Sequence, residues 1–147
     1  MPGRQYRFLK EDLGLGDIEL GRPNLGQDAP VLVYRLMQYS LHDVIVAEYG
    51  EAVAKELFYQ AGKAAGEKFC RNFLNVNLDM NAFVTELKNK LIEMKIGVLR
   101  IEELDPDNLH VVVSIAEDLA CSGLPITGDT VCNYDEGFLA GVFKVYT

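Results

Sequence analysis

The sequence predicts an α+β domain, and three observations along the chain carry that prediction. Apolar residues recur at helical spacing from Val31 to about Lys95. The period then changes to the alternation of a β-hairpin between Gly97 and Ala116. Helical spacing returns from Asp135. We therefore expect about four helices and antiparallel strands in one domain of ordinary size.

The first thirty residues have a different character from the rest of the chain. Glycine and proline punctuate residues 1–30, which predicts an irregular N-terminal arm. Short extended pieces are expected in this arm at Tyr6–Leu9 and Ile18–Leu20. Residues 31–147 are expected to form the single folded domain.

Two long helices are predicted at the start of that domain. The first begins after Pro30 and ends at Gly50, and the second runs from Glu51 to about Leu74. Five apolar residues of the first helix recur at helical spacing and form a stripe along it. They are Val33, Met37, Leu41, Val44 and Ile45.

Two glycines stand four residues apart inside the second predicted helix. Gly62 and Gly66 each cost about 1 kcal/mol relative to alanine in a helix interior, so the pair needs a reason. Close approach of another backbone is the simplest reason, and a ligand lying against the smooth strip is the alternative.

The second half of the domain combines a helix, a hairpin and a last helix. A third helix is expected from Met80 to Lys95, with Asp79 as its cap. The turn cluster Asp105–Asn108 predicts a hairpin between strands Gly97–Leu104 and Leu109–Ala116. Along the second strand, Val111, Val113 and Ile115 point to one face, and His110, Val112 and Ser114 to the other.

Composition and charge exclude several classes of function. The chain has 147 residues and a net charge of -8, with 14 basic residues scattered among 22 acidic ones. Nucleic-acid backbones and anionic membrane surfaces require clustered lysine and arginine, so neither is an expected partner. No apolar run approaches the roughly 20 residues of a membrane span, and no signal peptide is visible. We expect a cytoplasmic protein.

No self-sufficient catalytic motif is present. Gly14 and Gly16 lack the third glycine of a dinucleotide-binding loop, and Ser122 is not in a nucleophile-elbow setting. His42 is expected on a helix surface or in helix packing, and His110 at a strand end. A binding domain is therefore a better expectation than an enzyme.

The three cysteines differ in their setting. Cys70 lies beside the apolar stripe of its helix and is expected to be buried. Cys121 and Cys132 flank a loop of ten residues, whose geometry can bring the two sulfurs together. With a carboxylate such as Glu117 or Asp129 they would suit zinc, although zinc patterns usually have cysteines two to four residues apart. Buried thiols are the alternative.

Two segments resemble the 4-vinyl reductase domain family. Residues 131–141, VCNYDEGFLAG, are similar to that family's cysteine, acidic step and Gly-Phe-Leu-Ala-Gly helix start. Residues 57–66, LFYQAGKAAG, are similar to its glycine-spaced helix. The resemblance covers about residues 30 to 146. It implies a helical layer packed on an antiparallel sheet, the fold shared with subunits of a vesicle-tethering transport particle.

The resemblance also implies what the domain does. Family members look like binding or sensing modules for small aromatic or hydrocarbon ligands, and commonly dimerise through their helices. One branch is named for reducing a vinyl group of a tetrapyrrole. In the sensor branch a zinc site includes a cysteine that matches Cys132. Its other ligands come from a C-terminal hairpin, which we expect to be missing after Thr147, and Cys121 has no assigned role.

The expected function is therefore the binding or sensing of a small hydrophobic or aromatic molecule by a homodimer. Large side chains from the helices and the hairpin are the candidate ligand contacts, and filling the core is the alternative role of each. These candidates are Tyr59, Phe69, Phe83, Val112 and Phe138. The alternative functions are an accessory protein or reductase acting on a vinyl or tetrapyrrole substrate, and a structural scaffold dimer.

Overall fold

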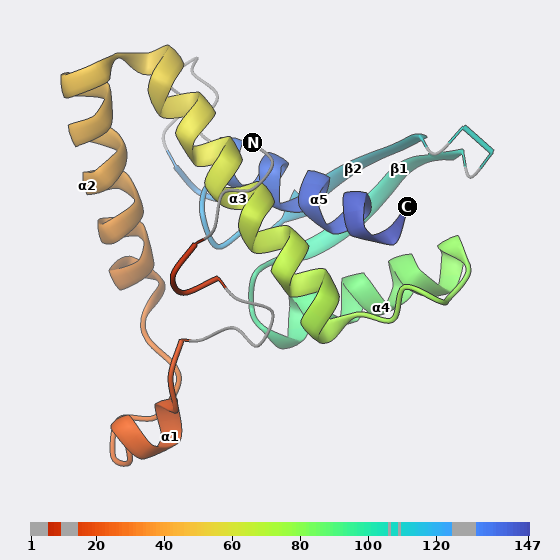
Figure 1. The fold of residues 1–147 in the computed structure, drawn as a ribbon, viewed down its shortest axis with the longest axis horizontal. Coiled ribbons are helices and arrows are strands. Elements are labelled where there is room, and N and C mark those ends of the chain that lie inside the picture. Colours follow the sequence, from red (N-terminus) through yellow and green to blue (C-terminus); the bar gives the residue numbers. More distant parts are fainter. Residues whose placement is uncertain (1–5, 10–14, 106, 109, 125–131) are drawn as a thin grey trace. The chain divides into compact units, whose positions relative to one another are not determined.

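The predicted α+β class is confirmed. The computed structural model describes residues 6–9, 15–105, 107–108, 110–124 and 132–147. These residues form five helices and one two-stranded antiparallel sheet (Figure 1). The elements in chain order are α1 (Ile18–Gly21), α2 (Val31–Tyr49), α3 (Glu51–Phe73), α4 (Met80–Glu93), β1 (Val98–Asp105), β2 (His110–Ala116) and α5 (Asn133–Tyr146).

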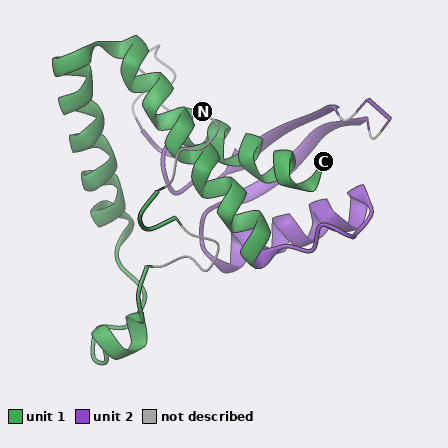
Figure 2. Ribbon diagram, in the orientation of Figure 1, with its two compact units in different colours: residues 1–72, 133–147 green, residues 73–132 purple. Residues whose placement is uncertain are grey.

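The chain forms two compact units (Figure 2). Unit 1 comprises Met1–Asn72 and Asn133–Thr147, and unit 2 comprises Phe73–Cys132. Unit 1 is thus built from two separate stretches of sequence, with unit 2 inserted between them. The units do not separate residues 1–30 from α2 and α3, and a domain boundary at residue 30 stays a prediction.

The N-terminal arm contains a helical turn where extended structure was expected. Residues 18–20 belong to α1, because the side chain of Asp17 accepts a hydrogen bond from the Leu20 amide at 2.9 Å and caps the turn. Residues 6–9 form a bend rather than a strand. Both extended pieces predicted in the arm are therefore wrong.

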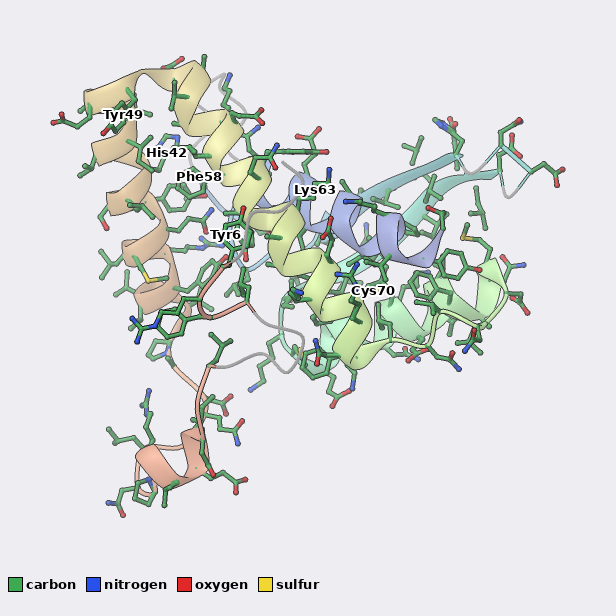
Figure 3. All side chains as sticks on the ribbon, viewed as in Figure 1. Tyr6, His42, Tyr49, Phe58, Lys63 and Cys70 are labelled. Atoms are coloured by element: carbon green, nitrogen blue, oxygen red, sulfur yellow. A yellow bond between two sulfur atoms is a disulfide. The ribbon has the colours of Figure 1, made fainter. Side chains whose placement is uncertain are left out.

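Helices α2 and α3 form a helical hairpin joined at Gly50, whose φ of 89° suits glycine. The predicted start of α2 after Pro30 and its end before Gly50 are confirmed. His42 of α2 packs against Phe58 of α3, with ring centroids 5.6 Å apart (Figure 3). The expectation that His42 serves helix packing is therefore correct.

The apolar stripe of α2 is not its packed face. Val33, Met37, Leu41 and Val44 are between 52% and 66% exposed, whereas Gln38 is the buried residue of this helix. The face toward α3 carries aromatic and polar side chains such as His42. The helical spacing shows that these residues share a face, but it does not show what covers that face.

Helices α3 and α5 cross within unit 1 through glycines on both sides. A Cβ on Gly62 would overlap the backbone carbonyl of Tyr134, and a Cβ on Gly66 would overlap that of Phe138. From the other side, Gly137 meets the carbonyl of Tyr59, and Gly141 meets the carbonyl of Lys63. The predicted reason for the α3 glycines, close approach of another backbone, is confirmed.

Unit 2 is built from a helix and the hairpin. Asp79 caps α4 as predicted, since its side chain accepts a hydrogen bond from the Ala82 amide at 2.9 Å. The helix packs against β1. The large buried side chains on α4 and β1 are Phe83, Leu87, Leu91 and Leu99.

The hairpin confirms the predicted strand faces and turn. Along β2, every second residue from His110 to Ser114 is exposed, and the residues between them are half-buried. The register shifts between Ile101 and Glu103, which leaves a bulge in β1. In the turn, the Asp105 carboxylate accepts hydrogen bonds from Asn108 Nδ2 at 2.7 Å and from the Asp107 amide at 3.2 Å.

Candidate functional site

Three of the predicted ligand contacts lie in unit 1, where they pack against protein. The ring centroids of Phe69 and Phe138 are 5.1 Å apart in an edge contact, and Phe69 is buried. Tyr59 is half-buried, and its carbonyl faces Gly137. All three residues therefore belong to the contact between α3 and α5.

The other two predicted contacts lie in unit 2. Phe83 is fully buried on α4. Val112 is 37% exposed on the face of β2 that it shares with His110 and Ser114. Their role as ligand contacts stays a prediction, as does that of the three residues in unit 1.

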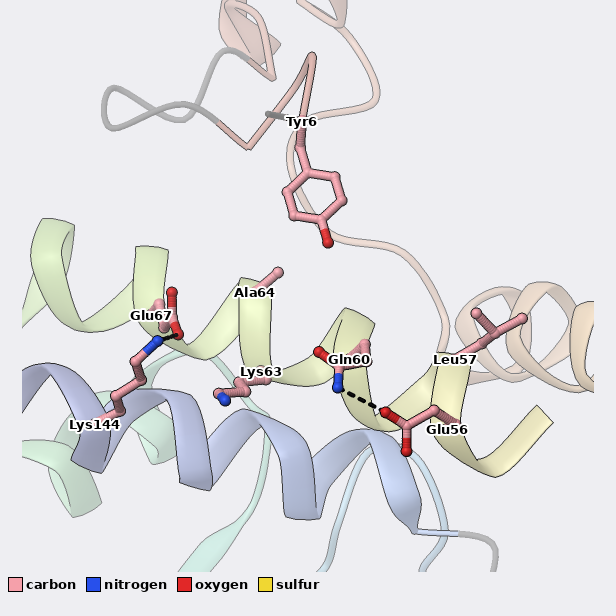
Figure 4. Close-up of a pocket in the computed structure, with 8 residues that line it drawn as sticks. All are labelled: Tyr6, Glu56, Leu57, Gln60, Lys63, Ala64, Glu67 and Lys144. Atoms are coloured by element: carbon pink, nitrogen blue, oxygen red, sulfur yellow. Dashed lines mark hydrogen bonds and ion pairs between the residues drawn. The ribbon is translucent and has the colours of Figure 1, made fainter. Parts of the chain in front are cut away.

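A groove in unit 1 is a candidate site that the sequence did not reveal. It has a volume of about 420 Å³, within the range of small-molecule sites, and runs along α3 (Figure 4). None of the five predicted contacts lines it. The lining residues are Tyr6, Glu56, Leu57, Gln60, Lys63, Ala64, Glu67 and Lys144.

The groove has an apolar side and a charged side. Tyr6, Leu57 and Ala64 supply apolar surface, with the Tyr6 ring lying across the groove from Ala64 (Figure 4). On the other side, Lys144 Nζ lies 2.9 Å from Glu67 Oε1 and ties α5 to α3. This combination suits an amphipathic ligand with an aromatic or aliphatic part and a polar group.

Lys63 supplies the distinctive charge of the groove. Its side chain is half-buried, and it forms no ion pair with any residue that the structure describes. The carboxylates beside it are engaged elsewhere: Glu56 accepts from Gln60 Nε2 at 2.7 Å, and Glu67 pairs with Lys144. An ammonium in this setting attracts an anionic or strongly accepting ligand group.

Sequence reasoning missed Lys63, although the sequence carries a signal for it. It is the charged residue within the run from Ala61 to Gly66, which otherwise contains alanine and glycine. Small neighbours leave a long side chain room to lie along a helix crossing. Tyr6 had no comparable signal, since it lies in the arm and reaches the groove through chain geometry.

Cys121 and Cys132 form a second candidate site, within unit 2. The two sulfurs are bonded as a disulfide across 11 positions of sequence, so the expectation that geometry brings them together is confirmed. Cys70 is buried, as predicted, and takes no part in the disulfide. The alternative of separate buried thiols is wrong for Cys121 and Cys132.

The carboxylate beside this cysteine pair belongs to Asp118. Its Oδ2 lies 2.8 Å from Cys121 Sγ, and the residue is 4% exposed. Glu117, which was expected to serve, is exposed. The other expected carboxylate, Asp129, lies outside the described residues. Asp118 was missed because spacing does not indicate which of two adjacent acids turns inward.

A hydrogen-bonded turn aims Asp118 at the cysteine. The Asp118 amide donates to Ser122 Oγ at 2.6 Å, and the Ser122 amide donates to the Asp118 carbonyl at 3.1 Å. The Leu119 amide anchors the turn by donating to the Ile96 carbonyl at 2.8 Å. Together these bonds fix the backbone on both sides of the carboxylate.

Tyr134 is a half-buried titratable residue where α3 and α5 cross. Burial, with a smaller contribution from the charge of Asp135, raises the pKa of its phenol above the ordinary value of 10.0. Its carbonyl is the group that faces Gly62. The packing of α5 therefore favours the neutral phenol of Tyr134 over its phenolate.

Comparison with known proteins finds relatives without an assigned role. The chain is 28% identical over 120 residues to the uncharacterized protein MJ1642 of Methanocaldococcus jannaschii, and 21% identical over 120 residues to the uncharacterized protein MJ0150 of that organism. Each match covers 82% of this chain but only 63% and 62% of the respective relative. The chain thus spans less than two thirds of these relatives.

The other comparisons return no match. No family model matches the chain, and no solved structure does. The resemblance to the 4-vinyl reductase domain family therefore stays a prediction. Among the helices in the described ranges, none has both the length and the apolar character needed to cross a membrane.

Proposed function

We propose that this chain is a small-molecule-binding or sensing domain, as its resemblance to the 4-vinyl reductase domain family implies, and that it acts in the cytoplasm. The observation that carries the proposal is the groove along α3, which combines apolar surface with the half-buried Lys63. Its volume of about 420 Å³ matches a ligand of modest size.

The chemistry of the groove narrows the ligand class. An aromatic ring or short acyl chain would lie against Tyr6, Leu57 and Ala64, and an acidic group would reach the Lys63 ammonium. A charge-assisted hydrogen bond is worth about 1.5–3 kcal/mol, reduced here because the groove is open to water. Phenols, aromatic carboxylates and short fatty acids fit this description, whereas a purely hydrocarbon ligand would leave the ammonium uncompensated.

Calorimetric titration with a panel of substituted phenols, benzoates and short fatty acids tests this proposal. Lys63→Met is expected to weaken binding of the acidic members roughly tenfold and to leave neutral analogues nearly unaffected. Lys55→Met, on an exposed position of α3 outside the groove, is the matched control. If no member of the panel binds the wild-type chain, or if both variants behave alike, the groove is not the site.

A second function, a scaffold built as a homodimer, is favoured by the exposed stripe of α2. Val33, Met37, Leu41 and Val44 carry no charge, and Asp43 lies at the edge of the stripe. A chain of net charge -8 repels its own copies, so an uncharged apolar face is the surface where two copies meet at least electrostatic cost. We propose a second copy of this chain as the occupant.

Sedimentation velocity tests the dimer separately from ligand binding. The wild-type chain is expected to sediment as a dimer at micromolar concentration, and Met37→Glu as a monomer with unchanged helical circular dichroism. Val53→Glu, at an exposed apolar position on α3, is the control and should stay dimeric. A monomeric wild-type chain would remove the scaffold proposal and leave the groove proposal intact.

A further inference from the structure

The cluster of Asp118, Cys121 and Cys132 in unit 2 brings three ligand atoms of two chemical kinds together. One carboxylate oxygen and the two sulfurs all lie within 4.8 Å of one another. Neither the groove nor the stripe of α2 uses any of these residues. Thiolate sulfur and carboxylate oxygen are both zinc ligands, and zinc accepts them in one tetrahedral set.

The geometry fits this donor set without a large rearrangement. Zinc–sulfur bonds of about 2.3 Å at tetrahedral angles place two ligating sulfurs roughly 3.8 Å apart. Opening the disulfide and separating the two sulfurs to that distance would therefore suffice. Asp118 Oδ2, already 2.8 Å from Cys121 Sγ, lies within the range of the third ligand.

The short oxygen–sulfur contact has different consequences in the two oxidation states. In the disulfide, Cys121 Sγ carries no proton to place between itself and the carboxylate oxygen. In the reduced state, a thiol proton or a bound cation occupies that space favourably. The turn between Asp118 and Ser122 holds the carboxylate in place in both cases.

We infer that Asp118, Cys121 and Cys132 form a redox-controlled zinc site, which binds the metal when the cysteines are reduced and releases it when they form their disulfide. The inference does not rest on the proposed ligand groove, since the two sites share no residue and can be tested independently.

The release step balances with a small-molecule disulfide, R–S–S–R, as oxidant. One zinc-bound thiolate attacks the R–S–S–R bond and forms a mixed disulfide, which releases the first R–S⁻. The second thiolate attacks the protein sulfur of that mixed disulfide. The Cys121–Cys132 bond forms, the second R–S⁻ leaves, and the zinc ion departs hydrated. Two electrons have passed from the cysteine pair to the oxidant.

Metal analysis of the full chain in two redox states provides the test. The wild-type chain, reduced and then freed of excess reductant, is titrated with zinc chloride, and bound metal is measured after gel filtration. One zinc per chain is expected in the reduced state. After oxidation with a small disulfide, zinc retention is expected to fall at least tenfold. This comparison needs no variant, so it holds even if a substitution unfolds the chain.

Variants then assign the ligands. Cys121→Ser, Cys132→Ser and Asp118→Asn are each expected to weaken zinc binding by roughly 10- to 100-fold or more, as loss of a ligand or its orientation does elsewhere. Cys70→Ala, at the buried cysteine outside the disulfide, is the matched control and should bind normally. In wild type, cobalt chloride should give thiolate-to-metal absorption that Cys121→Ser diminishes.

Three results would overturn the inference. The first is a reduced wild-type chain that binds no more zinc than the Cys121→Ser, Cys132→Ser double variant. The second is full zinc retention after the disulfide has formed. The third is loss of zinc in Cys132→Ser alone, with Cys121→Ser and Asp118→Asn unaffected, which would place the metal on a different set of ligands.

Discussion

The backbone carbonyl of Phe138 fills the space that a side chain on Gly66 would occupy. The same relationship recurs one turn away, where the carbonyl of Tyr134 faces Gly62, and it is reciprocated by Gly137 and Gly141 on α5. Glycine is required at these positions because two helix backbones come into direct contact. The crossing therefore has no tolerance for even one added methyl group.

Gly66→Ala is expected to destabilise the fold by about 1–3 kcal/mol, because the clash is with backbone and no rotamer change relieves it. For a chain of this size that corresponds to a drop in Tm of roughly 3–10 °C. Gly21→Ala is the matched control, since nothing lies within 4 Å of a Cβ there. Thermal unfolding followed by circular dichroism measures both. A Gly66→Ala variant as stable as Gly21→Ala would contradict the close crossing.

The ion pair between Lys144 and Glu67 is expected to contribute only modestly to the crossing. Its atoms are 2.9 Å apart, but the Lys144 side chain is 61% exposed, and exposed pairs couple by about 0.2–1 kcal/mol. A double-mutant cycle with Glu67→Gln and Lys144→Met measures this coupling by chemical denaturation. The coupling should shrink in high salt. A salt-independent coupling above 2 kcal/mol would show that the pair is more shielded from water than its exposure indicates.

Reduction of the Cys121–Cys132 disulfide in the presence of a chelator is expected to lower the free energy of unfolding by about 3 kcal/mol. The estimate follows from the loop entropy of a closure across 11 positions. Urea denaturation with and without reductant measures the difference. The Cys121→Ala, Cys132→Ala double variant should be insensitive to reductant, whereas Cys70→Ala should respond like wild type. Equal stability of the two redox states would contradict this expectation.

Alkaline pH is expected to loosen α5 through Tyr134. Burial, and to a lesser extent Asp135, raises the pKa of this phenol in the folded state, so the unfolded state releases its proton first as pH rises. Stability from this group is therefore complete below pH 10 and is lost as pH rises through the folded-state pKa. Tyr134→Phe should show a shallower alkaline decline in unfolding free energy. Identical pH profiles would exclude this contribution.

Local sequence signals predicted most of the secondary structure. Pro30, Gly50 and Asp79 marked helix ends that the structure confirms, because caps and backbone restrictions act within a few residues. The hairpin turn at Asp105 was predictable for the same reason. The arm was not, since the single capping bond from Asp17 was enough to turn Ile18–Leu20 from an extended piece into a helical one.

Contacts distant in sequence were harder to predict. The glycines of α3 predicted the close approach of another backbone. The helical spacing of the apolar residues of α2 could not show that the stripe containing Met37 is exposed. The sequence indicated that the sulfurs of Cys121 and Cys132 could come together, but not that they form a disulfide. Asp118 joins them through hydrogen bonds with Ser122, which the sequence pattern does not indicate. Lys63 became a site residue only through the position of Tyr6 and α5.

The discontinuous make-up of unit 1 has a consequence for synthesis on the ribosome. Helix α3 is complete at Phe73, but its glycine-lined surface receives α5 only after residues 133–147 have been made. Phe73–Cys132 is complete before that point and can form its helix and hairpin first, as local contacts favour. During that interval, the surface of α3 at Gly62 and Gly66 in the nascent chain is not covered by α5. Chaperone contacts and aggregation of truncated chains should therefore concentrate at this surface.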